Sequence, residues 1–71
     1  MKNYEISYFQ NDEEKERKDI NVNEVYTVSI ISDDFIELVS ANITKNSTDI
    51  ICHAFERMSE AVDLLDEAII K

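Results

Sequence analysis

The C-terminal third of the chain has the most regular pattern of apolar positions. From Ile51 onward, apolar residues recur in steps of four and three, and alanines recur every seven residues beside them. This spacing is typical of one face of an α-helix. It predicts a helix over residues 47–71, capped by Ser47, Thr48 or Asp49. The predicted core or oligomer seam of this helix consists of Ile51, Ala54, Phe55, Met58, Ala61, Val62, Leu65, Ala68 and Ile69.

Two N-terminal segments alternate between apolar and polar residues, as strands with one buried face do. The alternation is clearest over residues 20–31, and residues 3–10 are rich in β-forming side chains. Residues 35–44 fit a strand or a short helix. A strand is favoured because a short turn at 32–34 would pair it with the preceding strand. Residues 11–19 contain no apolar side chain and predict a solvated, charged loop.

Together these segments predict an α+β fold in a single domain over residues 1–71. We expect a small antiparallel sheet of two to three strands packed on one long C-terminal amphipathic helix. A chain this short buries only about 60% of its unfolded surface and usually needs a further source of stability. One cysteine cannot form an internal disulfide. The helical seam could therefore pack on the chain's own sheet, on the same helix in a homodimer, or on both.

Net charge is the strongest compositional feature. Sixteen Asp and Glu against seven Lys and Arg give a formal charge of −9. This balance argues against direct binding of nucleic acid or of anionic membranes, because both need basic side chains. No apolar segment resembles a signal peptide or has the length of a membrane span. We therefore expect a cytoplasmic protein in which Cys52 is reduced.

Residue types that carry catalysis are scarce. The only histidine, His53, follows the only cysteine, Cys52. Neighbours on a helix point about 100° apart, so the two do not face a common site. Glycine is absent, and with it the loops that bring backbone close to phosphates and cofactors. We expect no enzyme activity, no cofactor and no metal site.

Carboxylates are arranged in rows along the predicted helix. Four of them are spaced four, three and four residues apart, which places them on the face opposite the seam. No Lys or Arg occurs between Met58 and Ile70, although like charges at this spacing destabilise a helix slightly. The predicted acidic partner-binding face consists of Glu56, Glu60, Asp63, Glu67, Asp33, Asp34 and Glu37. Beside it we expect the apolar anchors Tyr4, Tyr8, Phe9 and Leu64, with Leu64 projecting onto the polar side of the helix.

With its length, its charge, its carboxylate rows and no catalytic set, the chain resembles the small, strongly acidic proteins that bacteriophages make to disable host proteins. Several members of that class are DNA mimics. The resemblance implies a non-enzymatic inhibitor that presents DNA-like carboxylates to the basic channel of a host nucleic-acid-binding protein, such as a sliding clamp, nuclease, glycosylase or polymerase. The alternative is an acidic interaction or assembly module, antitoxin-like or accessory, that binds its partner through the apolar seam.

Overall fold

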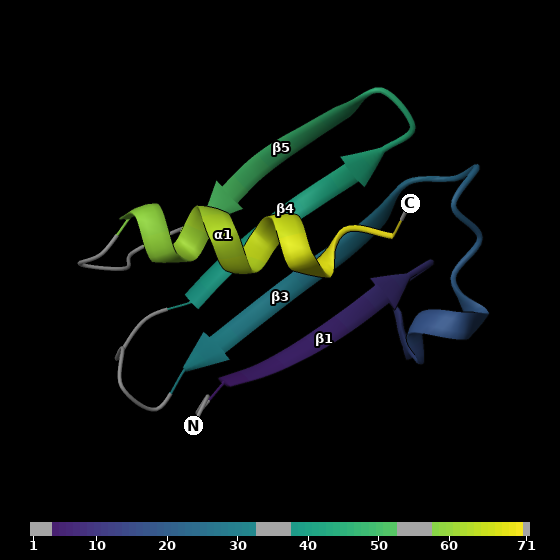
Figure 1. Ribbon diagram of the computed structural model, residues 1–71. Coiled ribbons are helices and arrows are strands. Elements are labelled where there is room, and N and C mark those ends of the chain that lie inside the picture. The colour runs from purple at the N-terminus through teal and green to yellow at the C-terminus, as the bar shows by residue number, and fades with distance from the viewer. Residues whose placement is uncertain (1–3, 33–37, 53–57, 71) are drawn as a thin grey trace.

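A five-stranded antiparallel sheet dominates the computed structural model, in which residues 4–32, 38–52 and 58–70 are described. The strand order is β2-β1-β3-β4-β5, and one helix crosses one face of the sheet (Figure 1). The helix is α1 (Met58–Ala68), and a 3-10 turn, η1 (Arg17–Asp19), follows β2. The strands are β1 (Tyr4–Gln10), β2 (Glu13–Lys15), β3 (Tyr26–Ser32), β4 (Leu38–Thr44) and β5 (Ser47–Cys52).

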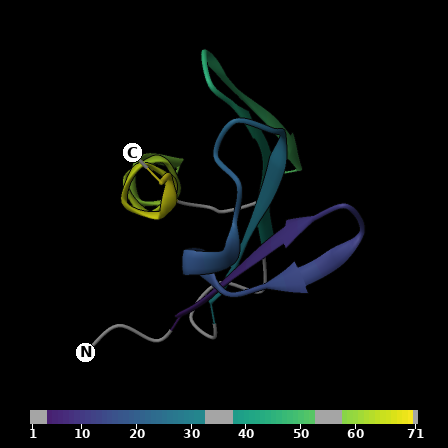
Figure 2. The same ribbon diagram turned by 90° about the vertical axis from the view of Figure 1, so that its right-hand side faces the viewer.

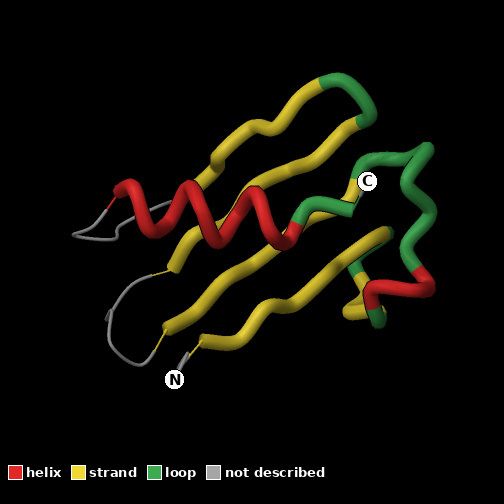
Figure 3. Tube along the Cα trace, viewed as in Figure 1, coloured by secondary structure: helices red, strands yellow, loops and turns green. Residues whose placement is uncertain are grey.

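The predicted fold class is wrong in the size of the sheet and the length of the helix. The sheet has five strands instead of two to three, and α1 spans 11 residues. Residues 47–52 form strand β5 and not the first turns of a helix (Figure 3). The physical reason is the run of β-branched Thr48, Ile50 and Ile51, which suits a strand that pairs with β4 across a two-residue turn.

Residues 11–19 are also more ordered than the predicted loop. Asn11 and Asp12 both have left-handed backbone, with φ of 56° and 64°. A two-residue hairpin loop of this kind has the twist of the flanking strands, and Asn and Asp tolerate it best after Gly. The turn therefore folds the charged residues Glu13–Lys15 back along β1 as an edge strand.

The strand predicted over 20–31 begins later than expected, at Tyr26. Residues 20–25 form a loop that is held by the side chain of Gln10, which is only 4% exposed. The Gln10 Nε2 group donates to the carbonyls of Asn21 (2.8 Å), Val25 (3.3 Å) and Glu24 (3.4 Å), and Gln10 Oε1 accepts from the Asn21 N–H (2.9 Å). A buried amide must have its polar atoms satisfied, and this loop satisfies them. Of the two interpretations of 35–44, the structure has a strand over Leu38–Thr44.

The core lies between the sheet and α1. Alternate residues of the strands face the helix, so that Tyr8, Val28 and Ala41 lie side by side on neighbouring strands. Figure 2 shows α1 end-on against this face, and no described element covers the other face. The buried apolar residues are Tyr8, Ile20, Tyr26, Val28, Ile30, Ala41, Ile43, Leu65 and Ala68.

Two tyrosines fasten the C-terminal end of α1 to the sheet. The Tyr8 hydroxyl donates to the carbonyl oxygen of Ala68 at 2.7 Å, and the backbone N–H of Ile70 donates to the Tyr26 hydroxyl at 3.1 Å. The last carbonyls of a helix lack partners within the helix, so the Tyr8 hydroxyl satisfies a group that the fold would otherwise bury unpaired. Burial also raises the pKa of Tyr8 above its usual value.

Candidate interaction surfaces

The outward face of α1 is acidic. Asp63, Asp66 and Glu67 are exposed, and the helix contains no Lys or Arg. Glu67 also accepts a hydrogen bond of 3.5 Å from the Tyr4 hydroxyl of β1. The helix is held in a fixed orientation on the sheet, and its carboxylates therefore project from a rigid support.

The structure brings together only part of the predicted acidic face. Asp63 and Glu67 lie on the exposed side of α1, as the spacing predicts. The other predicted members fall outside what the structure describes, either as whole residues or, for Glu60, as a side chain. They are Glu56, Glu60, Asp33, Asp34 and Glu37.

The predicted seam is divided between two elements. Ile51 lies on β5 and is 57% exposed, whereas Leu65 and Ala68 of α1 are buried against the sheet and Ile69 is half-buried. Val62 is 42% exposed and therefore lies outside the buried stripe. The remaining members lie outside the described residues or have undescribed side chains: Ala54, Phe55, Met58 and Ala61. Apart from Val62, the described helical members of the seam pack on the chain's own sheet.

The predicted apolar anchors are distributed over different surfaces. Tyr8 is buried in the core, and Tyr4 is half-buried beside it. Leu64 packs against the core and does not project from the polar side of the helix, because the buried stripe is rotated from the predicted seam toward Leu64 and away from Val62. Phe9 is half-buried on the open face of the sheet.

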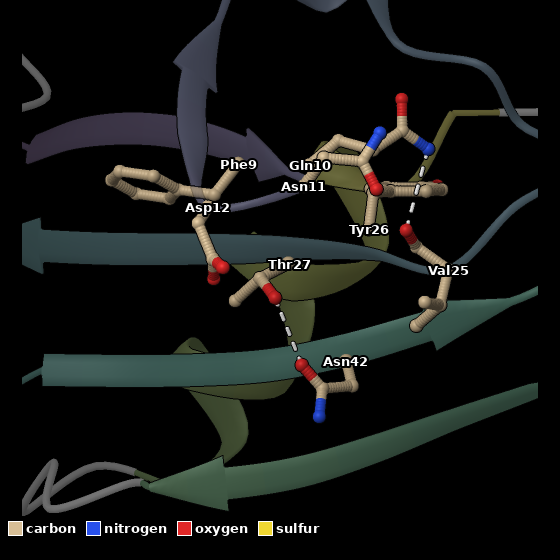
Figure 4. A pocket seen from close by; sticks show the side chains of 8 residues that line it. All are labelled: Phe9, Gln10, Asn11, Asp12, Val25, Tyr26, Thr27 and Asn42. Carbon is tan, nitrogen blue, oxygen red and sulfur yellow. Dashed lines mark hydrogen bonds between the residues drawn. The ribbon is translucent and has the colours of Figure 1, made fainter.

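A shallow hollow of about 600 Å³ lies at one end of the open face (Figure 4). Phe9 and Asp12 line it from the β1–β2 hairpin, and Thr27 and Asn42 line it from β3 and β4. The Thr27 hydroxyl donates to Asn42 Oδ1 at 2.9 Å. Sequence patterns did not indicate this hollow, because it depends on the register that places Thr27 opposite Asn42. Its lining residues offer hydrogen bonds and two aromatic rings, those of Phe9 and Tyr26, and they contain no nucleophile paired with a base.

The described residues also bear on metal chemistry and on membranes. Within residues 4–32, 38–52 and 58–70, no three His, Cys, Asp or Glu side chains gather closely enough to hold a metal ion. None of the described helical residues forms a segment with the length and apolar character of a membrane span. Cys52 is a free, exposed thiol.

Comparisons of this chain with protein-family models, with curated proteins and with solved structures find no match. Two described surfaces are exposed and distinct in character: the acidic face of α1, and the edge strand β5, all six residues of which are exposed.

Proposed function

We propose that this chain is a non-enzymatic, acidic inhibitor that binds the basic surface of a nucleic-acid-binding protein. In this proposal the carboxylates on α1 take the place of phosphates. The phage-encoded, cytoplasmic setting is part of the same proposal and follows from the resemblance to acidic inhibitors of host proteins.

One observation carries the proposal: apart from Val62, the apolar side chains described on α1 pack on the chain's own sheet, and the helix presents acids outward. Leu65 and Ala68 are buried, while Asp63 and Asp66 on the same helix are exposed. Among the described side chains of α1, a partner that approaches from solvent meets three carboxylates and one apolar residue, Val62. This arrangement favours recognition through charge over the alternative, in which a partner would bind the apolar seam.

The physical mechanism is electrostatic. A protein that binds nucleic acid has Lys and Arg arranged to meet phosphates, and an acidic ligand of net charge −9 is attracted to that field. Successive acids on a helix rise about 4.5 to 6 Å along its axis, which is comparable to the advance of about 3.4 Å between phosphates along one DNA strand. Because α1 is fixed to the sheet through Tyr8 and Tyr26, little order has to be created on binding.

The test is capture of partners from a bacterial lysate at low salt, followed by elution with a salt gradient and competition with DNA. We expect binding to weaken steeply as salt rises from about 50 to about 300 mM, because screening shortens the reach of exposed charges. DNA should displace the chain from the same partner. A partner that is held equally well across this salt range, or that binds DNA and the chain together, would contradict the proposal.

Two matched double variants distinguish the contribution of the acids on α1 from the contribution of the overall negative charge. Asp63→Lys with Asp66→Lys changes α1, and Glu13→Lys with Glu14→Lys changes β2, where both acids are also exposed. Each substitution replaces a negative charge with a positive one and raises the formal charge by two, so each double variant has a formal charge of −5 instead of −9. The helix pair should weaken partner binding by about tenfold more than the β2 pair. Equal losses would show that net charge alone is recognised.

A further inference from the structure

The two edges of the sheet are protected to different degrees. At one edge, β2 is three residues long and carries Glu13, Glu14 and Lys15. At the other edge, β5 is six residues long and all six are exposed. Short, charged edge strands prevent pairing with other chains, whereas a longer neutral edge invites it. The β5 edge is longer and carries a single charged residue, Asp49, and its pairing with β4 has one register irregularity, between Ile50 and Cys52.

Exposed apolar side chains gather at the β5 edge. Ile50 and Ile51 are 43% and 57% exposed, and Val62 of α1 is 42% exposed. Val62 and Glu67 lie about 140° apart on the helix, on either side of the buried stripe. Because Glu67 meets Tyr4 of β1, Val62 lies on the flank toward β5. Half of the large apolar residues that the described chain exposes therefore lie on β5 or on the flank of α1 toward it.

Charge indicates what kind of partner this edge fits. Residues 44–52 contain one Lys and one Asp, so this edge is neutral in a chain of net charge −9. A basic partner is attracted to acidic surfaces such as the outward face of α1, and not to β5. A second copy of this acidic chain is repelled from most of the surface and least repelled here. The edge thus suits a copy of itself.

We propose that two copies of this chain pair through β5, antiparallel, and form one continuous sheet of ten strands. A closed two-fold dimer of this kind keeps both helices on the same face of the sheet and pairs residues symmetrically about the axis. An axis at Asp49 would oppose two carboxylates, which is unfavourable. An axis at Ile50 opposes two isoleucines. Ile50 pairs with Ala41 within the chain and so lies on the helix-covered side of the sheet, where the two isoleucines extend the apolar layer.

This inference is independent of the proposed function, and the salt dependence of binding distinguishes the two proposals. Pairing of two acidic chains should strengthen as salt rises, because the remaining repulsion is screened, whereas binding to a basic partner should weaken. The oligomeric state can also be measured without any partner. A failure of one proposal would leave the other intact.

The test is sedimentation velocity of the full chain, with a reductant present, from about 5 to about 500 µM. We expect a concentration-dependent dimer. Ile50→Lys should weaken it by at least about tenfold, because two ammonium groups then face each other at the axis. Ile31→Lys is the matched control, since Ile31 is a strand isoleucine away from β5 that is slightly more exposed than Ile50 (52% against 43%), and it should leave dimerisation unchanged.

The native cysteine provides a second measurement that needs no substitution. With the axis at Ile50, the two Cys52 residues lie on opposite sides of the axis, each beyond the register irregularity that follows Ile50 in the pairing with β4. The two Cys52 Cα atoms are then at most about 13 Å apart along the strands and about 5 Å across them. Nitroxide labels on Cys52 should show separations below about 25 Å. A monomer at all concentrations, a dimer insensitive to Ile50→Lys, or clearly longer label separations would each overturn the proposal.

Discussion

The two faces of the sheet are built from alternate residues of the same strands, yet they differ in chemistry. On the face under α1, Val28 and Ile30 are fully buried. On the open face the intervening Thr27 and Ser29 are half-buried and polar, and Ser40 of β4 lies opposite Ser29. One face is stabilised by packing, and the other remains compatible with water without a cover. Substitutions at strand positions that face α1 should therefore change the free energy of unfolding more than substitutions at the alternate positions on the open face.

The largest expected effect is in the centre of the covered face. Ile30→Ala removes buried methyl groups and leaves a cavity, and should lower the free energy of unfolding by about 3 kcal/mol. Ser29→Ala, one residue earlier on the open face, should change it by less than about 0.5 kcal/mol. Urea denaturation of both variants checks the difference. Similar losses in the two variants would mean that the faces are not distinguished by packing.

The next effect concerns the buried amide at the end of the covered face. Gln10→Ala leaves the Asn21 N–H and several loop carbonyls without their partner, and should cost about 2 kcal/mol. Asn42→Ala removes one hydrogen bond from the open face, where water can replace it, and should cost about 0.5 kcal/mol. Thermal or urea denaturation measures both. A Gln10→Ala variant as stable as the parent chain would show that the 20–25 loop needs no internal support.

A smaller effect is expected where the covered face holds the helix end. Tyr8→Phe removes the hydrogen bond to Ala68 and should cost about 1 kcal/mol near neutral pH. The raised pKa of Tyr8 means that the folded state favours the neutral phenol. Its contribution is therefore complete below the unfolded pKa of about 10 and declines as the pH rises toward the folded pKa. Denaturation at about pH 8 and about pH 10.5 should show a smaller alkaline loss in Tyr8→Phe than in the parent chain.

The smallest effect tests the open face directly. Ser29→Val places a good strand former among polar neighbours and should raise stability by no more than about 0.5 kcal/mol. Urea denaturation again provides the measurement, with Ser40→Val as a companion on the adjacent strand. A loss above about 1 kcal/mol from either variant would show that this face is packed in solution and not open.

Local alternation predicted some of these elements, and tertiary pairing decided the others. Tyr26, Val28 and Ile30 alternate with polar residues, and the structure has them on one buried face of β3. Ile51 stands four residues before Phe55, so the helical spacing included it in the seam, yet pairing with β4 placed it in a strand. Short apolar runs fit both the helical and the strand repeat, and here the turn at 45–46 favours the strand because it lets β5 pair with β4.

The candidate interaction surfaces were harder to predict from the sequence than the fold. Spacing along the helix was enough to group Asp63 with Glu67, because helix geometry is regular. It could not orient the helix, and so it assigned Leu64 to the polar side when the sheet covers it. No sequence pattern indicated that Gln10 is buried, because its burial depends on the 20–25 loop closing around its side chain. The Asn11-Asp12 pair between β-forming segments was a turn signal that could have revealed the hairpin.

The strand order has a kinetic consequence. Every strand pairs with its nearest or next-nearest neighbour in sequence, so the sheet can assemble by closing short loops. The contact between Tyr8 and Ala68, by contrast, joins residues 60 positions apart. We therefore expect β1, β3 and β4 to be formed in the folding transition state and α1 to dock after it. Substitutions at Leu65 should then accelerate unfolding and leave the folding rate nearly unchanged.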